Sequence, residues 1–314
     1  MMKYTKQIAM RQTLGEVLLK LGEEIPELVV LDSDVSSSTQ TIHFGKKYPN
    51  RFFNVGVAEA NMVDIAGGMA TCGLRPVASA FAIFLTLKGA EQIRNVICYN
   101  KLPVILLGGY AGLSDSFDGA SHQSITDIAV MRAMPNLNVI VPADSVELIQ
   151  ALEQMIHFDG PSYIRICRNP TPVLFENEEP FKFGKIRKTQ EGTDITIAAC
   201  GVPVYMAMEA ADELKAIGIS AEVLNVSTIK PIDSETLVNS VRKTGCILTI
   251  EEHSIIGGMG SAVAEVLMKN HPVKMDSIGI SDTFTSTGPY MELLQKYGIS
   301  KESIIEKALK LIRV

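Results

Sequence analysis

The sequence has few cysteines, and their arrangement fits neither a disulfide framework nor a zinc site. Five cysteines are scattered along 314 residues, and no two of them form a CxxC pair. An odd, scattered set of this kind is typical of proteins kept in a reducing cytosol. We therefore expect a cytoplasmic protein without structural zinc.

Long apolar runs and basic tracts are also missing. The N-terminal segment lacks the continuous apolar core of a signal peptide. The longest apolar runs, such as LPVILLGG, are too short to span a bilayer. The net charge is −6 and no basic patch occurs, which argues against nucleic-acid binding as a main role. We expect neither a membrane nor a nucleic acid as a partner.

What the sequence does contain is a regular alternation of strand and helix patterns, which predicts an α/β fold. Short apolar runs ended by Gly, Pro or Asp are typical of buried parallel strands. These runs are ELVVLDSD, PVASAFAIF, PVILLGG, NVIVPAD, SYIRICR, TDITIAACG, SAEVLNV and CILTIEE. Helical patterns lie between them at 11–24, 58–72, 86–100, 122–134, 144–157, 203–217, 234–243 and 258–270.

A segment rich in proline, glycine and charge, residues 168–192, separates the two halves of the chain. Such composition is typical of an interdomain connection. We therefore expect two doubly wound α/β domains: a larger one at 1–180, a linker at 181–192 and a smaller one at 193–314.

The most informative stretch is 54–84. Glu59 lies at the start of an apolar, small-residue helix, and Phe81 and Phe84 close the strand pattern that follows. A lone acid followed by aromatic residues suits a site where a carboxyl group bonds the edge of a flat heteroaromatic ring. Burial favours the neutral form of such a carboxyl group, whereas the helix dipole favours the anion. Ordinary structure explains each feature separately, with Glu59 in a helix cap and the phenylalanines, with Leu87, in the core.

The segment 110–127, YAGLSDSFDGASHQSITD, is polar and glycine-rich. It lies between a predicted strand and a predicted helix, where ligand loops of open α/β sheets occur. It contains Asp118 and His122. A histidine there could bond a substrate hydroxyl or move a proton near neutral pH, or it could simply begin a helix with a satisfied ring.

Arg165 and Arg168 end an apolar strand pattern. A guanidinium at the carboxyl edge of a parallel sheet suits a phosphate, although charges at strand ends are often only solvated. Serines 36–38 could donate further hydrogen bonds or cap a helix. The glycines of EEHSIIGGMGSAVAEVL favour a structural turn before a helix.

Taken together and in this order, these segments resemble the pyrimidine-binding and C-terminal domains of transketolase, from about residue 8 to 312. The resemblance is carried by GVAEANM, ASAFAIF, GLSDSFDGASHQ, MRAMPNLNVIVPAD, STIKPID and EEHSIIGGMGSAVAEVL. The family uses thiamine diphosphate to move a two-carbon ketol unit between sugar phosphates.

The resemblance implies roles on the cofactor side of the site. Glu59 is similar to the family's carboxyl group that bonds the aminopyrimidine ring nitrogen. Phe81 and Phe84, with Leu87 beside them, resemble the pocket for that ring. Asp34, in LDSDVSSST, resembles an acidic residue near the cofactor.

The resemblance also implies roles on the substrate side. Asp118 and His122 match the DG-x-x-H segment that reads the sugar hydroxyls, and His122 is a candidate for proton handling. Arg11, Ser38 and Arg168 resemble positions that hold the sugar phosphate.

Two departures from the family pattern follow. Tyr110 stands where the family has a second substrate histidine, and no GDG occurs in the chain. In the family a GDG…N signature holds the metal and the diphosphate, a dense anion that needs a cation and converging donors. The resemblance therefore implies a split enzyme. A separate N-terminal subunit with the GDG…N motif supplies Mg²⁺ (or Ca²⁺), and the two chains form a two-plus-two heterotetramer.

Other assignments stay open at this point. The beta chain of a 2-oxo-acid dehydrogenase has the same two domains but a different histidine loop. A 1-deoxyxylulose-5-phosphate synthase has a DG-x-x-H loop but is normally one long chain. A transketolase specialised for another sugar phosphate fits nearly as well, and a non-catalytic scaffold subunit is an answer of a different class.

Overall fold

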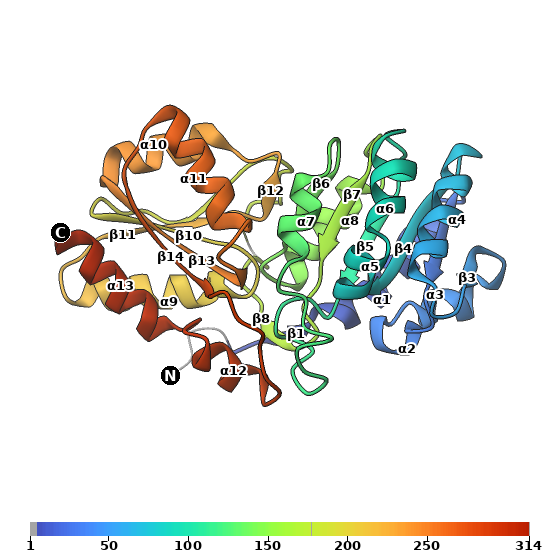
Figure 1. Cartoon of the computed structure of the whole chain (residues 1–314), viewed down its shortest axis with the longest axis horizontal. Coiled ribbons are helices and arrows are strands. Elements are labelled where there is room, and N and C mark those ends of the chain that lie inside the picture. The colour runs from blue at the N-terminus through green and yellow to red at the C-terminus, as the bar shows by residue number, and fades with distance from the viewer. Residues whose placement is uncertain (1–4, 177, 314) are drawn as a thin grey trace.

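The chain is described here by a computed structural model that covers residues 5–176 and 178–313. It contains two α/β units side by side, each built around its own sheet (Figure 1). The seven-stranded sheet has the order β12-β6-β7-β5-β4-β2-β3, and the five-stranded sheet has the order β14-β13-β10-β11-β9. Strands β1 and β8 form a separate two-stranded ribbon. The fold is therefore the two-domain α/β arrangement that the sequence predicts.

The strands are β1 (Gln7–Ala9), β2 (Leu28–Asp32), β3 (Phe52–Asn54), β4 (Arg75–Phe81), β5 (Ile105–Gly109), β6 (Asn138–Ile140), β7 (Ser162–Arg165), β8 (Pro170–Pro172), β9 (Arg187–Gln190), β10 (Ile195–Ala199), β11 (Ala221–Asn225), β12 (Thr228–Lys230), β13 (Cys246–Ser254) and β14 (Lys274–Ile280). The helices are α1 (Met10–Glu24), α2 (Ser36–Thr39), α3 (Ile42–Lys47), the 3₁₀ turn η1 (Pro49–Arg51), α4 (Glu59–Thr71), α5 (Ala82–Lys88), α6 (Ala90–Gln92), the π-helical segment η2 (Ile93–Cys98), α7 (Asp127–Ala133), α8 (Ser145–Met155), α9 (Pro203–Ala216), α10 (Ser234–Thr244), α11 (Met259–Asn270), α12 (Tyr290–Lys296) and α13 (Lys301–Arg313).

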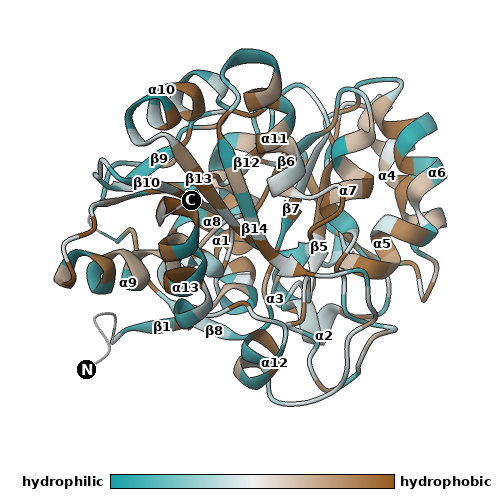
Figure 2. Cartoon of the chain, turned by 60° about the vertical axis from the view of Figure 1, so that its left-hand side comes forward, coloured by the Kyte–Doolittle hydropathy of each residue, from teal (hydrophilic) through white to brown (hydrophobic). Residues whose placement is uncertain are grey.

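All eight predicted strands are present. Strands β2, β5 and β10 are buried along their whole length, because helices cover both faces of a doubly wound sheet. In the second unit, α9 and α13 lie on one face of the sheet and α10 and α11 on the other (Figure 1). Strands of both sheets are largely hydrophobic, while the covering helices carry hydrophilic residues on their outer sides (Figure 2).

Three predicted elements differ from the structure. Phe81 ends β4, but Phe84 lies on α5, because the chain turns into a helix directly after the strand. An apolar run alone does not separate a short buried helix from a strand. The helix expected at 86–100 is broken into α5, α6 and η2, with Gly89 closing α5. The helix expected at 122–134 begins at Asp127, which leaves His122 in a loop.

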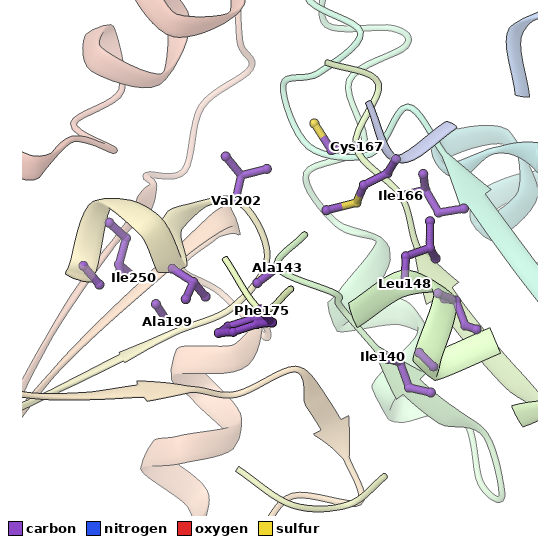
Figure 3. Close-up of a cluster of buried hydrophobic side chains, with 14 of the residues drawn as sticks. Ile140, Ala143, Leu148, Ile166, Cys167, Phe175, Ala199, Val202 and Ile250 are labelled. Carbon is purple, nitrogen blue, oxygen red and sulfur yellow. The ribbon is translucent and has the colours of Figure 1, made fainter. Parts of the chain in front are cut away.

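The two units are joined by more than the connecting segment. Strand β9 lies within the expected linker, 181–192, and pairs with β11 of the second sheet. Strand β12 follows β11 in sequence yet pairs with β6 of the first sheet. One apolar cluster runs through both units, with Ile140 and Leu148 on one side, Phe175 between, and Ala199 and Ile250 on the other (Figure 3). Burial of each large side chain there contributes about 1.5–3 kcal/mol, so the units form a shared core.

The first sheet brings four chain segments to one edge. Strands β7, β5, β4 and β2 are neighbours and run parallel, so their carboxyl ends lie at the same edge. The segments that follow these strands are 166–168, 110–126, 82–88 and 33–38. Ligands of open α/β sheets bind outside the carboxyl ends of the strands. Within residues 5–176 and 178–313, no helix is both long enough and apolar enough to cross a bilayer.

Candidate active site

Glu59 is the first residue of α4, and its side chain is only 3% exposed. The sequence offers this acid no basic neighbour, but folding supplies one: the ammonium of Lys88 donates to Glu59 Oε2 at 2.5 Å. Lys88 ends α5, and its Nζ also lies 5.3 Å from the centroid of the Phe84 ring. The cation thus connects the buried acid to an aromatic face.

Aromatic side chains from three segments form a wall beside this pair. The rings of Phe81 and Phe84 are nearly parallel, with centroids 6.3 Å apart and an interplanar angle of 27°. Tyr110 also stacks on Phe81, with ring centroids 4.4 Å apart and an interplanar angle of 22°. His122 stands edge-on to Phe84 at 5.0 Å and 82°. Because Phe81 and Phe84 are only half-buried, they keep accessible surface that a flat ligand ring could cover.

Two arginines and a serine gather around Tyr110. Arg11 Nη1 donates to the Tyr110 hydroxyl at 3.0 Å, and that hydroxyl donates to the Ser38 carbonyl at 3.4 Å. The Arg168 guanidinium carbon lies 4.8 Å from the Tyr110 ring centroid. Arg11 Nε is buried and has no hydrogen-bond partner. Two guanidinium groups at one end of the aromatic wall are suited to an anion such as a phosphate.

A buried carboxyl group, Asp115, links this cationic end to the 110–126 loop. It is fully buried and accepts from Arg168 Nη1 at 2.9 Å, while its Oδ2 atom has no hydrogen-bond partner. Burial, first, and the nearby Asp118 carboxylate raise the pKa of Asp115 to about 7, against the opposing effect of Arg168. Asp115 therefore changes charge near neutral pH, next to a candidate phosphate-binding arginine.

The 110–126 loop, which runs from the end of β5 to α7, also carries the two polar residues predicted from its sequence. Asp118 is exposed and His122 is half-buried. The Ser121 hydroxyl lies 3.0 Å from His122 Nδ1. Gly119 has a φ of +82°, a left-handed conformation that glycine adopts without strain. This turn brings His122 back toward the aromatic wall.

Two of the residues predicted on the cofactor side are exposed. Asp34 has a φ of +64° and accepts from Asn54 Nδ2 at 3.0 Å. Leu87 lies on α5 next to Lys88 and is 51% exposed. Neither takes part in the ring contacts of Phe81, Phe84, Tyr110 and His122 described above.

The sequence did not point to Lys88 or Asp115. Lys88 follows Phe84 by four residues, which places both on one face of a helix. The sequence pattern assigns Phe84 to a strand at 76–84, so this helical spacing is not evident from it. Asp115 lies three residues before Asp118 in a polar loop, and only its burial distinguishes it from the other polar residues there.

At the glycine turn before α11, a side chain of the same domain binds the backbone N–H groups at the start of the helix. The Glu251 carboxylate accepts from the backbone N–H groups of Met259 at 2.6 Å and Gly260 at 2.8 Å. This arrangement agrees with the structural turn expected from the sequence. In the described parts of the chain, no group of three or more His, Cys, Asp or Glu side chains is placed to hold a metal ion.

Comparison with known proteins places this geometry in a family. Residues 6–173 match the transketolase pyrimidine-binding domain, and residues 184–304 match the transketolase C-terminal domain. The chain belongs to the transketolase family. Glu59 and the aromatic wall lie within the residues that match the pyrimidine-binding domain.

Relatives of similar length align with nearly the whole chain. A protein of Methanocaldococcus jannaschii named as a putative transketolase C-terminal section is 44% identical over 96% of this chain and 95% of its own length. A 6-deoxy-6-sulfo-D-fructose transketolase subunit of a Clostridium species is 37% identical over 95% of this chain and 93% of its own. Among solved structures, a split-gene transketolase in an inactive β4 tetramer is 42% identical, has a TM-score of 0.90, and overlaps 98% of this chain and 99% of its own. The chain is thus a transketolase C-terminal subunit of the split type.

Proposed function

We propose that this chain, together with a separate N-terminal subunit, is a thiamine-diphosphate-dependent transketolase that moves a two-carbon ketol unit between sugar phosphates. The observation that carries the proposal is the buried Glu59 beside the Phe81 and Phe84 rings, at one end of a wall whose other end carries Arg11 and Arg168. An acid edge and an aromatic face suit a heterocycle, and the arginines suit a phosphate.

The residues present fit the aminopyrimidine part of thiamine diphosphate. Glu59 would bond a ring nitrogen and hold a proton there, and the side chains of Phe81 and Phe84 would support the ring face. Lys88 compensates the charge of the buried acid through its 2.5 Å hydrogen bond. Bound thiamine diphosphate supplies the nucleophilic carbon and the electron sink that cleavage next to a carbonyl group needs. Asp34 and Leu87 are exposed and would face the cofactor or the second chain.

The substrate side is assigned to the other end of the wall. Arg11, Ser38 and Arg168 would hold the sugar phosphate. Asp118 and His122 would bond the sugar hydroxyls, with His122 also moving a proton near neutral pH.

A second chain completes the site in this proposal. It would carry the GDG…N motif, hold Mg²⁺ (or Ca²⁺) and the diphosphate, and form a two-plus-two heterotetramer with this chain. The solved relative described as a split-gene transketolase in an inactive β4 tetramer supports this division, because an assembly of the β chain alone is called inactive there.

The test is coexpression of this chain with a GDG-bearing N-terminal transketolase chain, sought first among the neighbouring genes. We expect the two chains to copurify, and thiamine diphosphate with Mg²⁺ to bind measurably by calorimetry only to the complex. Ketose and aldose phosphates are then screened as substrates of that complex. Appreciable turnover by the purified single chain would contradict the split site. A complex that binds the cofactor but transfers no ketol unit would contradict the activity.

Asp115→Asn tests the phosphate end separately. Above pH 7 the Asp115 carboxyl group is ionised and competes with a substrate phosphate for Arg168, whereas below pH 7 it is protonated and competes less. We expect the ratio of the wild-type KM to the Asp115→Asn KM for a sugar phosphate to rise as the pH rises through about 7. A change of roughly tenfold would correspond to 1.4 kcal/mol of binding energy.

The measurement is KM from pH 6 to 8.5 for both proteins in the reconstituted complex. The exposed Asp159→Asn serves as a control, since Asp159 pairs with Arg75 and not with Arg168. A constant ratio across this range would show that Asp115 does not act on the phosphate site.

A further inference from the structure

Glu252, on β13 of the second domain, is buried and its carboxyl group reaches the 110–126 loop of the first domain. Oε1 accepts from the backbone N–H of Leu113 at 2.6 Å, and Oε2 accepts from the Tyr290 hydroxyl at 2.8 Å. A Cβ atom on Gly112 would lie 2.4 Å from Oε1, so no larger side chain fits between the loop and this acid. The carboxyl group therefore holds the loop backbone at close range.

The segment 285–288, just before α12, holds the loop at a second place. Gln123, which follows His122, is fixed at both ends of its amide: Nε2 donates to the Ser286 carbonyl at 3.0 Å, and Oε1 accepts from the Thr285 hydroxyl. The backbone N–H of Gly288 donates to the Ser116 carbonyl at 3.1 Å. In Figure 1 this segment lies beside the loop at the lower centre of the molecule.

A third connection lies where the loop enters α7. Arg165 Nη2 donates both to the Ser124 carbonyl at 3.0 Å and to the Glu252 backbone carbonyl at 2.8 Å. The backbone N–H of Ser254 donates to the Ile125 carbonyl at 2.8 Å. The second domain thus contacts the loop near its start, in its middle and at its end, although it supplies none of the proposed ligand-binding residues.

We propose that the second domain acts as a clamp on the 110–126 loop and that Glu252 is its main positioning residue. The clamp fixes the backbone that carries Asp115, Asp118 and His122. The consequence for substrate use rests on the proposed function, whereas the mechanical role does not. Glu252 touches no reacting group; it acts through the loop.

Amide hydrogen exchange of the full chain, alone and with its partner, tests the clamp. Glu252→Ala removes the acceptor of the Leu113 N–H and leaves it buried without a partner. We expect exchange across residues 111–124 to become roughly 5- to 30-fold faster, the factor that one or two kcal/mol of lost local stability produces. Glu252→Gln keeps an acceptor oxygen and should restore most of the protection.

The matched control is Glu222→Ala. Glu222 is another fully buried acid of the second domain, but it pairs with Lys188 and Lys243. If Glu222→Ala accelerates amide exchange in the loop as much as Glu252→Ala does, general destabilisation explains the result and the clamp proposal is wrong. Unchanged loop exchange in a folded Glu252→Ala protein would equally overturn it.

Should Glu252→Ala fail to fold, Thr285→Val takes its place. It removes only the hydroxyl that bonds Gln123 and keeps the side-chain shape, so faster exchange is expected near residues 119–124. Unchanged exchange there would overturn the clamp at that end of the loop.

In the reconstituted complex, Glu252→Ala should raise KM for the sugar phosphate and lower kcat, with unchanged affinity for thiamine diphosphate. A loss of cofactor affinity instead would contradict a role confined to the substrate loop. If the wild-type complex transfers no ketol unit at all, the proposed function fails, while the exchange result still decides the clamp.

Discussion

Glu59→Gln is expected to lower turnover of the reconstituted complex by about 10²–10⁴-fold while leaving cofactor affinity much less affected. Removal of a positioned acid or base typically has a rate effect of this order. The glutamine side chain would keep the size of the original and one acceptor oxygen, so the ring pocket formed with Phe81 and Phe84 stays intact. It would lose the ability to hold a proton for the ring, and that ability is the role proposed for Glu59.

The measurement is kcat at saturating thiamine diphosphate, together with the cofactor Kd from calorimetry. Glu91→Gln is the matched control, because Glu91 is exposed on α6 and its carboxylate accepts from Asn95 Nδ2. A near-normal kcat for Glu59→Gln would remove Glu59 from the mechanism. An equal loss in Glu91→Gln would point to a general effect of charge.

The sequence predicts part of this arrangement for a physical reason. Strands buried on both faces leave continuous apolar runs, so β2, β5 and β10 are visible in the sequence. Segments that follow such strands lie at one edge of a parallel sheet, which predicts a ligand loop with His122, whereas Glu59 and Phe81 are linked by their nearness within 54–84.

The rest depended on contacts between distant residues. Lys88 is 29 positions from Glu59, and only the turn of α5 brings its ammonium to the carboxylate. Asp115 owes its raised pKa to burial that no local pattern indicates. The edge strands β9 and β12 pair antiparallel with β11 and β6, respectively. They are only three or four residues long, which is too short to leave a recognisable strand pattern in the sequence.

Asp127→Asn is expected to be strongly destabilising, lowering the free energy of unfolding by about 3–5 kcal/mol. Asp127 and Arg165 form an ion pair with side chains 0% and 6% exposed and an Nε–Oδ2 distance of 2.8 Å. Removal of one partner of a buried pair leaves the other charge buried without compensation. Asp127 Oδ2 also accepts from the Tyr163 hydroxyl at 2.6 Å, and the buried Arg165 holds both Ser124 and Glu252. Loss of the anion therefore weakens the joint between the two domains as well as the pair itself.

Denaturant unfolding of the full chain measures this loss of stability. Repeating the measurement across pH shows in which direction pH changes the stabilisation by the Asp127 carboxylate. Burial alone would raise the pKa of Asp127, but Arg165 and the neighbouring donors outweigh it, so the pKa is lowered. The stabilisation is therefore fully present above the unfolded-state pKa of about 3.9 and is lost as the pH falls through the lower folded-state value. At pH 7 the control Asp159→Asn, which breaks the exposed pair with Arg75, should change stability by no more than about 1 kcal/mol. If both variants unfold at the same denaturant concentration, the Arg165–Asp127 pair does not hold the domains together, and the exchange protection of the 110–126 loop must come from Glu252 and the 285–288 segment alone.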